Sequence, residues 1–233
     1  DPVRNFAYIG LSYPLVAAQG PHASHGSASA SGYVQKLNLL DLSVVGQVRV
    51  EASPGDVLLS EDGKRLVASH FDLVRATKNP TDLAKARSSI AVLDPSTIGD
   101  EGAAASFVST CVAAHGMAMT QPGGSPLYVT CYGEDKVAII DLDNADTPIE
   151  YVEVGPGVTG FGSPTYGPYA ALMLPDKQTL VISSTVSKDV RFMDIPTKTM
   201  LSDRTILALG APFFPAVSAD GSKLVIPTQQ PDA

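Results

Sequence analysis

Residues 220–226 of the 233-residue chain read Asp-Gly-Ser-Lys-Leu-Val-Ile, a two-residue turn signal followed by an apolar run. An Asp-Gly pair supplies the positive φ angles that a short hairpin needs, and the run after it suits a buried strand. Residues 62–68, 123–129 and 176–182 repeat this pattern. Each copy therefore predicts a hairpin between two antiparallel strands, here called strand A and strand B.

A third strand, C, is expected after each hairpin, because an apolar pair followed by Asp recurs at similar intervals. The four aspartates are Asp41, Asp94, Asp141 and Asp194. Their carboxylates are expected to accept backbone N–H bonds in the turn to a fourth strand, D. The sequence places the D strands at residues 44–50, 105–109, 149–154 and 206–209.

Repeats of this kind predict an all-β fold, a β-propeller of four-stranded antiparallel blades. The equivalent leucines are 44 to 61 residues apart, within the propeller range. About four and a half blades of a six- to eight-bladed ring are expected, in one incomplete domain over 1–233. The repeats span approximately 1–51, 52–110, 111–155, 156–210 and, in part, 211–233. Residues 81–87 form the one expected helical stretch, inside a long loop.

The repeat resembles the YVTN family of propeller repeats over nearly the whole chain. Residues 127–131, Leu-Tyr-Val-Thr-Cys, and 137–141, Val-Ala-Ile-Ile-Asp, come closest to the family pattern. Pro54, Pro168 and Pro212 each stand twelve residues before a strand-B leucine, and His115 takes this place in the third repeat. The resemblance implies a propeller outside the cytoplasm, periplasmic, cell-surface or secreted. It leaves the activity open, because propellers of this kind serve as binding platforms, as lactone hydrolases and as partners of redox proteins.

The predicted strands do not close a ring. The first repeat supplies strands B, C and D, the last supplies A and B, and merging them leaves a surplus strand. A ring of this type usually needs six to eight four-stranded blades. The missing blades are therefore expected on another chain or fragment, or to have been removed.

The composition excludes two classes of partner. The net charge of −8 and the absence of a basic cluster argue against nucleic acid, which requires a basic stripe. No apolar run approaches the length of about 20 residues that a membrane helix needs, so no membrane span is expected.

One end of the repeat collects the unusual residues. The start of strand A, the end of strand B, and the B–C and D–A connections lie at the same end of a four-stranded blade. All four histidines, both cysteines and two long insertions, residues 13–32 and 72–87, map to this end, here called the B–C/D–A face. Long loops on one side of a rigid scaffold are where binding usually occurs.

The histidines permit two interpretations. His22, His25, His70 and His115 could bind Cu or Zn, because neutral imidazole suits both metals. Alternatively, His22 and His25 are exposed loop residues, while His70 and His115 hydrogen-bond to neighbouring backbone. The second interpretation is favoured, because an isolated histidine more often satisfies local hydrogen bonds.

The two cysteines, Cys111 and Cys131, lie at the same end of adjacent strands. They could form a disulfide, a buried pair of thiols or a pair of soft metal ligands. A disulfide is preferred, because secreted propellers of the family that the chain resembles tolerate such a bridge.

A glycine-rich D–A connection follows the third repeat and carries three aromatic residues, Phe161, Tyr166 and Tyr169. Their rings could line a ligand pocket, or they could cover the seam between blades. With His70 and His115 they form the predicted ligand-binding set.

The sequence supports two hypotheses for the function of the chain. The first is an extracytoplasmic, non-enzymatic platform that recognises a partner protein or a small ligand through the B–C/D–A face. The second is a redox accessory or enzyme that uses a Cu or Zn ion held by histidines on that face. A lactonase-like hydrolase would need acidic metal ligands around the channel, and the sequence identifies no such set. No nucleophile motif and no phosphate-binding loop occurs in the chain.

Overall fold

The computed structural model describes residues 1, 3–14, 29–218 and 220–229. The chain forms two compact units. The first contains Asp1–Ala114 and Gln121–Gly124, and the second contains His115–Thr120 and Ser125–Ala233. Each unit is described separately, and the prediction of one domain over the whole chain stays a prediction.

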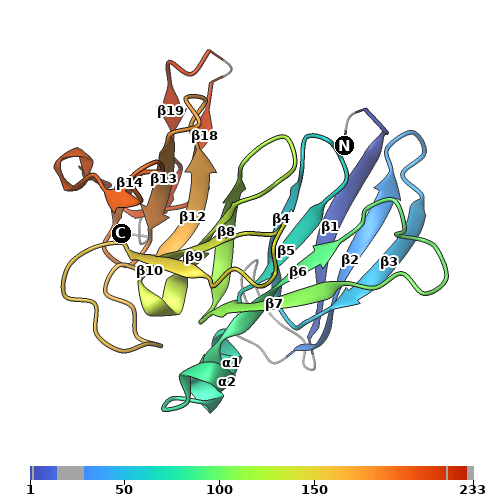
Figure 1. Ribbon diagram of the computed structural model, residues 1–233, viewed down its shortest axis with the longest axis horizontal. Helices are drawn as coiled ribbons and strands as arrows, with labels where there is room; N and C mark the ends of the chain where they lie inside the picture. The colour runs from blue at the N-terminus through green and yellow to red at the C-terminus, as the bar shows by residue number, and fades with distance from the viewer. Residues whose placement is uncertain (2, 15–28, 219, 230–233) are drawn as a thin grey trace. The chain divides into compact units, whose positions relative to one another are not determined.

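The first unit contains two antiparallel sheets (Figure 1). Sheet 1 has three strands in the order β1-β2-β3, and sheet 2 has four in the order β4-β5-β6-β7. The strands of sheet 1 are β1 (Phe6–Pro14), β2 (Ser29–Asn38) and β3 (Val44–Val50). Those of sheet 2 are β4 (Pro54–Leu59), β5 (Leu66–His70), β6 (Ser88–Leu93) and β7 (Ser106–Cys111).

The second unit continues the same sheet order. Sheet 3 is β8 (Ala114–Met119), β9 (Leu127–Cys131), β10 (Lys136–Ile140) and β11 (Glu150–Glu153), with the 3-10 turn η2 (Tyr132–Glu134) after β9. Sheet 4 is β12 (Pro168–Met173), β13 (Thr179–Ser184) and β14 (Asp189–Asp194). Its outermost strand is broken into β15 (Thr199–Met200) and β16 (Ile206–Leu207) by η3 (Ser202–Arg204).

The last hairpin is sheet 5, also in the second unit. It is one pair of strands interrupted in the middle, so that β17 pairs with β20 and β18 pairs with β19. Its pieces are β17 (Ala211–Pro212), β18 (Ala216–Val217), β19 (Leu224–Val225) and β20 (Thr228–Gln229).

The turn chemistry that the sequence predicts is confirmed. Gly63, Gly124 and Gly221 have φ angles of 67°, 84° and 71° in the predicted A–B turns, and Lys177 takes the same conformation in the fourth, with a φ of 56°. In the C–D turns the carboxylates of the predicted aspartates accept backbone N–H bonds. The bonds run from Ser43 to Asp41, from Ser96 to Asp94, from Asp143 to Asp141 and from Thr197 to Asp194, at 2.8 to 3.0 Å.

The loop between β5 and β6 departs from the expectation. The sequence predicts one helical stretch at residues 81–87, and α2 (Leu83–Ala86) lies there, but α1 (Leu73–Lys78) precedes it. A carboxylate oxygen of Asp72 caps α1 by accepting the backbone N–H of Arg75 at 2.9 Å. A helix this short shows no repeat of apolar positions, so the capping residue is its only sequence signal.

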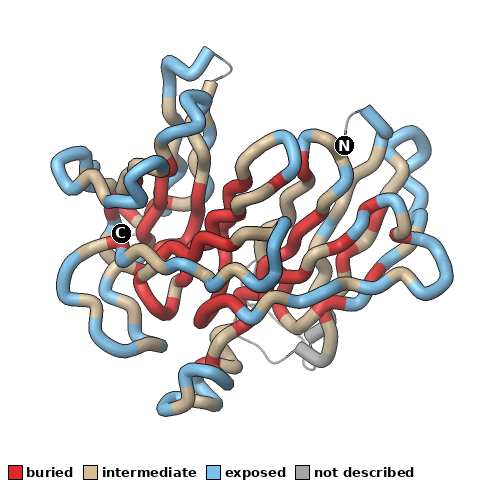
Figure 2. The backbone as a smooth tube through the Cα atoms, viewed as in Figure 1, coloured by how far each residue is buried: buried red, intermediate tan, exposed pale blue. Residues whose placement is uncertain are grey.

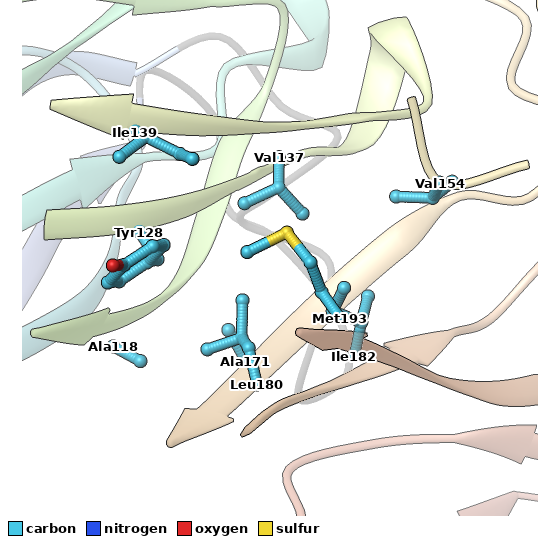
Figure 3. Close-up of a cluster of buried hydrophobic side chains, with 9 residues drawn as sticks. All are labelled: Ala118, Tyr128, Val137, Ile139, Val154, Ala171, Leu180, Ile182 and Met193. Carbon is cyan, nitrogen blue, oxygen red and sulfur yellow. The ribbon is translucent and has the colours of Figure 1, made fainter. Parts of the chain in front are cut away.

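Each unit has its own core between neighbouring sheets. In the first, Val34 and Val48 of sheet 1 pack with Leu66 of sheet 2. In the second, residues of sheets 3 and 4 pack together, and Figure 3 shows the side chain of Met193 reaching from β14 toward Val137 on β10. Figure 2 shows the buried positions along the inner strands, with exposed positions at the turns and outer strands. Full burial of a large apolar side chain such as Val34, Leu66 or Met193 stabilises the fold by about 1.5–3 kcal/mol.

Candidate functional site

The first strands of sheets 3 and 4 approach closely in the second unit. His115 stands at the start of β8, and its Nδ1 lies 3.0 Å from the backbone oxygen of Tyr169 on β12. Because a carbonyl oxygen only accepts, Nδ1 carries the proton. The hydroxyl of Thr130 donates to the same oxygen at 3.2 Å. Gly116 allows this approach, because a Cβ there would lie 2.4 Å from the Cα of Ala170.

Aromatic rings gather around this contact. The His115 ring stacks on Tyr169 with centroids 4.0 Å apart, and both residues are buried. Phe213 and Phe214, after β17, meet the Tyr169 ring edge-on at 5.3 and 5.8 Å, and Tyr132 meets it at 6.5 Å. These five residues are here called the aromatic cluster. Phe214 is its exposed member, with 43% of its surface accessible.

The glycine-rich loop before β12 is held by a buried carboxylate. Asp135 accepts the backbone N–H groups of Thr165, Tyr166 and Gly167 at 2.6, 3.0 and 2.8 Å. Asp135 is 4% exposed and has a φ of 52°, a conformation that Asp tolerates better than most residues. Three charge-assisted hydrogen bonds to one side chain therefore set the path of the chain into β12.

Tyr166 and Phe161 occupy different surroundings in this loop. The guanidinium of Arg191 stands 4.1 Å from the Tyr166 ring centroid, and the Tyr166 hydroxyl donates to the backbone oxygen of Pro156 at 2.7 Å. Arg191 is itself held by Asp189 at 2.6 Å. Tyr166 packs against the core of the second unit. Phe161 is half-buried and makes no ring contact within the described residues.

His70 lies in the first unit, at the end of β5. Its Nδ1 donates to the backbone oxygen of Ser89 at 2.7 Å, and its Nε2 is buried without a hydrogen-bond partner among the described residues. Burial lowers the pKa of His70, against the opposing effects of the Ser89 hydrogen bond and the Glu51 carboxylate. The imidazole is therefore neutral at pH 7, with a bare nitrogen at Nε2.

The metal hypothesis stays a prediction. His22 and His25 lie outside the described residues. Within the described part of the chain, no group of three or more His, Cys, Asp or Glu side chains could hold a metal ion. The Nδ1 atoms of His70 and His115 both face backbone carbonyl oxygens, as the alternative interpretation predicts.

The preferred interpretation of the cysteines is confirmed. Neither is free, and Cys111 and Cys131 are disulfide-bonded. Both are fully buried.

Sequence reasoning found His115 and Tyr169 but missed the other members of the aromatic cluster. Phe213 could have been found from the register of strand A. It follows Pro212 in the same way as Tyr169 follows Pro168. Asp135 was missed because its three partners are 30 or more residues away in the sequence.

Comparison with known proteins supports the architecture. No protein-family model matches the chain, and no curated protein matches it in sequence. Among solved structures, the β-propeller domain of Cps50 (Swd1) from Myceliophteria thermophila has a TM-score of 0.65 at 13% identity, covering 94% of this chain and 62% of that one. The fold is a β-propeller. Each sheet described above is a blade or part of one.

Two further solved structures are similar. Hydrazine synthase from Kuenenia stuttgartiensis has a TM-score of 0.61 at 20% identity, covering 93% of this chain and 55% of that one. A putative 6-phosphogluconolactonase from Bacteroides uniformis has a TM-score of 0.61 at 13% identity, covering 97% of this chain and 62% of that one. The chain thus spans between about half and three-fifths of the length of these structures. Identities this low support the fold alone.

No helix in the described ranges is long and apolar enough to cross a membrane.

Proposed function

We propose that this propeller is an extracytoplasmic binding platform that recognises a partner protein or a small ligand through its B–C/D–A face. The observation that carries the proposal is the aromatic cluster of the second unit. His115, Tyr169 and Phe213 come from the starts of strand A in three successive blades, and Phe214 adds an exposed ring. Exposed aromatic residues on a rigid base are typical centres of protein interfaces.

The geometry of the cluster suits recognition. The buried stack of His115 on Tyr169 supports Phe214 from below, at centroid distances of 5.6 and 5.8 Å. A side chain that is already held in place loses little conformational entropy when a partner covers it. Phe214 is therefore the proposed anchor, and His70, Phe161 and Tyr166 are proposed as further ligand-binding residues on the same face of their own blades.

We expect Phe214→Ala to weaken binding of selected peptides about tenfold or more, because it removes the anchor ring. Peptides would be selected from a random dodecapeptide library against the wild-type chain, and their affinities measured by calorimetry. Leu209→Ala is the matched control, because Leu209 is 86% exposed in the same unit and belongs to no cluster. If the selected peptides bind Phe214→Ala as tightly as Leu209→Ala, the aromatic cluster is not the binding site.

An extracytoplasmic location is supported by the disulfide, because disulfides persist mainly in oxidising compartments. The partner set proposed here excludes nucleic acid, since the chain carries a net charge of −8.

We also propose that further blades, on another chain or fragment, complete the ring. Sheet 1 has three described strands where sheets 2 and 3 have four, and sheet 5 is a hairpin. Similar solved propellers are longer than this chain. Native mass spectrometry of the untagged protein from its source is expected to give a mass above 24.2 kDa, the mass of these residues. A species of 24.2 kDa that binds the selected peptides would contradict the proposal that further blades complete the ring. It would leave the proposed binding site unaffected.

A further inference from the structure

A cavity of about 480 Å³ lies in the first unit, away from the B–C/D–A face. It is bounded by the start of β1, by β2, and by the A–B and C–D turns of sheet 2. Its volume is within the range of small-molecule sites. The lining residues include Arg4, Phe6, Tyr8, Lys36, Lys64 and Asp94.

Lys36 is the unusual member of this lining. It is 6% exposed, although lysine is among the residues least often buried. Its Nζ donates to the backbone oxygen of Pro95 at 3.0 Å and stands 4.4 Å from the centroid of the Phe6 ring. An ammonium group has three donors. Within the described residues one donor has an acceptor, so others remain for a ligand.

Two more donors face the same cavity. Burial raises the pKa of the Tyr8 phenol, against an opposing effect of Arg4, so its hydroxyl stays protonated and able to donate. Lys64 is exposed in the A–B turn. Neither the Tyr8 hydroxyl nor the Lys64 ammonium has a hydrogen-bond partner within the described residues.

Arg4 is placed over the cavity by the glycine of the neighbouring turn. Its guanidinium donates to Asp1 at 2.9 Å and to the backbone oxygen of Asp62 at 3.2 Å. It lies where a Cβ on Gly63 would be, so any larger residue there would displace it. Because Asp1 already neutralises Arg4, the ligand's charge would be met chiefly by Lys36 and Lys64.

The charge of the lining is positive, whereas the chain has a net charge of −8. Three cationic side chains line the cavity against the single carboxylate of Asp94. One oxygen of that carboxylate, Oδ1, is turned to the chain itself, because it accepts the N–H and hydroxyl of Ser96 at 2.8 and 2.6 Å. These bonds hold the pKa of Asp94 below its usual value. Asp94 therefore offsets the buried ammonium of Lys36 without using its remaining donors.

We infer that this cavity binds a small organic anion, with its charged head at Lys36, Lys64 and Tyr8 and its apolar body along the rings of Phe6 and Tyr8. A partly buried cation binds an anion more strongly than an exposed one, because water screens it less. Aromatic walls add apolar contact that a bare ion cannot use. This site is separate from the proposed binding face.

The test titrates the full chain with phenyl phosphate, benzoate and inorganic phosphate, and follows the backbone amides of Gly63 and Ser96 by NMR. We expect phenyl phosphate or benzoate to bind with a dissociation constant of about 1 mM or tighter. Inorganic phosphate should bind at least several-fold more weakly, because it has no apolar body. Whichever aromatic anion binds more tightly identifies the head group as phosphate or carboxylate.

Lys36→Met should weaken binding about tenfold, because it keeps the length of the side chain and removes its charge. Lys64→Met should weaken anion binding to a smaller extent, because Lys64 is at an exposed position. This second variant tests the proposal if Lys36→Met does not fold. Lys78→Met is the charge-matched control on α1, outside the cavity. The proposal is overturned if neither aromatic anion shifts the cavity amides, or if the lysine variants and the control bind equally.

Discussion

Replacing Gly116 by alanine is expected to destabilise the second unit by about 3 kcal/mol or more. The new Cβ would lie 2.4 Å from the Cα of Ala170 and 2.6 Å from the backbone oxygen of Tyr169. Both atoms belong to the backbone, so no side-chain rotation relieves the clash. The first strands of two blades would have to separate, which would also loosen the contact of His115 with Tyr169.

Urea unfolding tests this prediction. The loss of stability should appear as a lower urea midpoint, with an unchanged dependence of the unfolding free energy on urea concentration. Gly123→Ala is the matched control, because a Cβ at Gly123 meets nothing within 4 Å. Gly123 is exposed, and the same substitution there should change stability by less than about 0.5 kcal/mol. Equal midpoints for the two variants would mean that the strands do not approach as described. If the urea midpoint of Gly116→Ala is lower, peptide binding at the aromatic cluster should also be weaker in this variant.

The substitution Asp135→Asn is expected to lower the free energy that holds the glycine-rich loop in place by about 2–4 kcal/mol. The carboxylate accepts three backbone N–H groups, from Thr165, Tyr166 and Gly167. An amide side chain removes the negative charge and places an NH₂ donor against a backbone donor. The loop should then detach locally before the unit unfolds as a whole.

Amide hydrogen exchange at residues 165–167 measures this effect directly. Their exchange should accelerate in Asp135→Asn far more than exchange in β13 and β14. Asp146→Asn is the control, because Asp146 is exposed and its carboxylate holds no backbone group within the described residues. Unchanged protection in Asp135→Asn would show that the loop is held by packing alone. Tyr169 follows this loop and its ring contacts Phe214. Peptide binding at Phe214 should therefore weaken when the loop detaches.

Local sequence determined most of the blade architecture. The A–B turns need positive φ angles, and in three of the four predicted turns an Asp-Gly or Gly-Gly pair supplies them without help from distant residues. The C–D turns are closed by an aspartate that bonds to N–H groups two or three residues away. Both signals act over a few residues, so they are readable in the chain before it folds. The helix α1 was not predicted, because its six residues are too few to show the apolar periodicity by which helices are recognised.

Tertiary structure alone decided which residues meet. Lys36 reads as an ordinary strand lysine until the turn of a neighbouring sheet, 59 residues away, buries it. Asp135 reads as a turn residue, and its role depends on a loop about 30 residues downstream. The same limit applies to the aromatic cluster, whose rings come from three blades. The repeat determined each blade through short-range turn chemistry. The packing of blade on blade decided the candidate sites, because it brings together residues whose separation in the sequence carries no pattern.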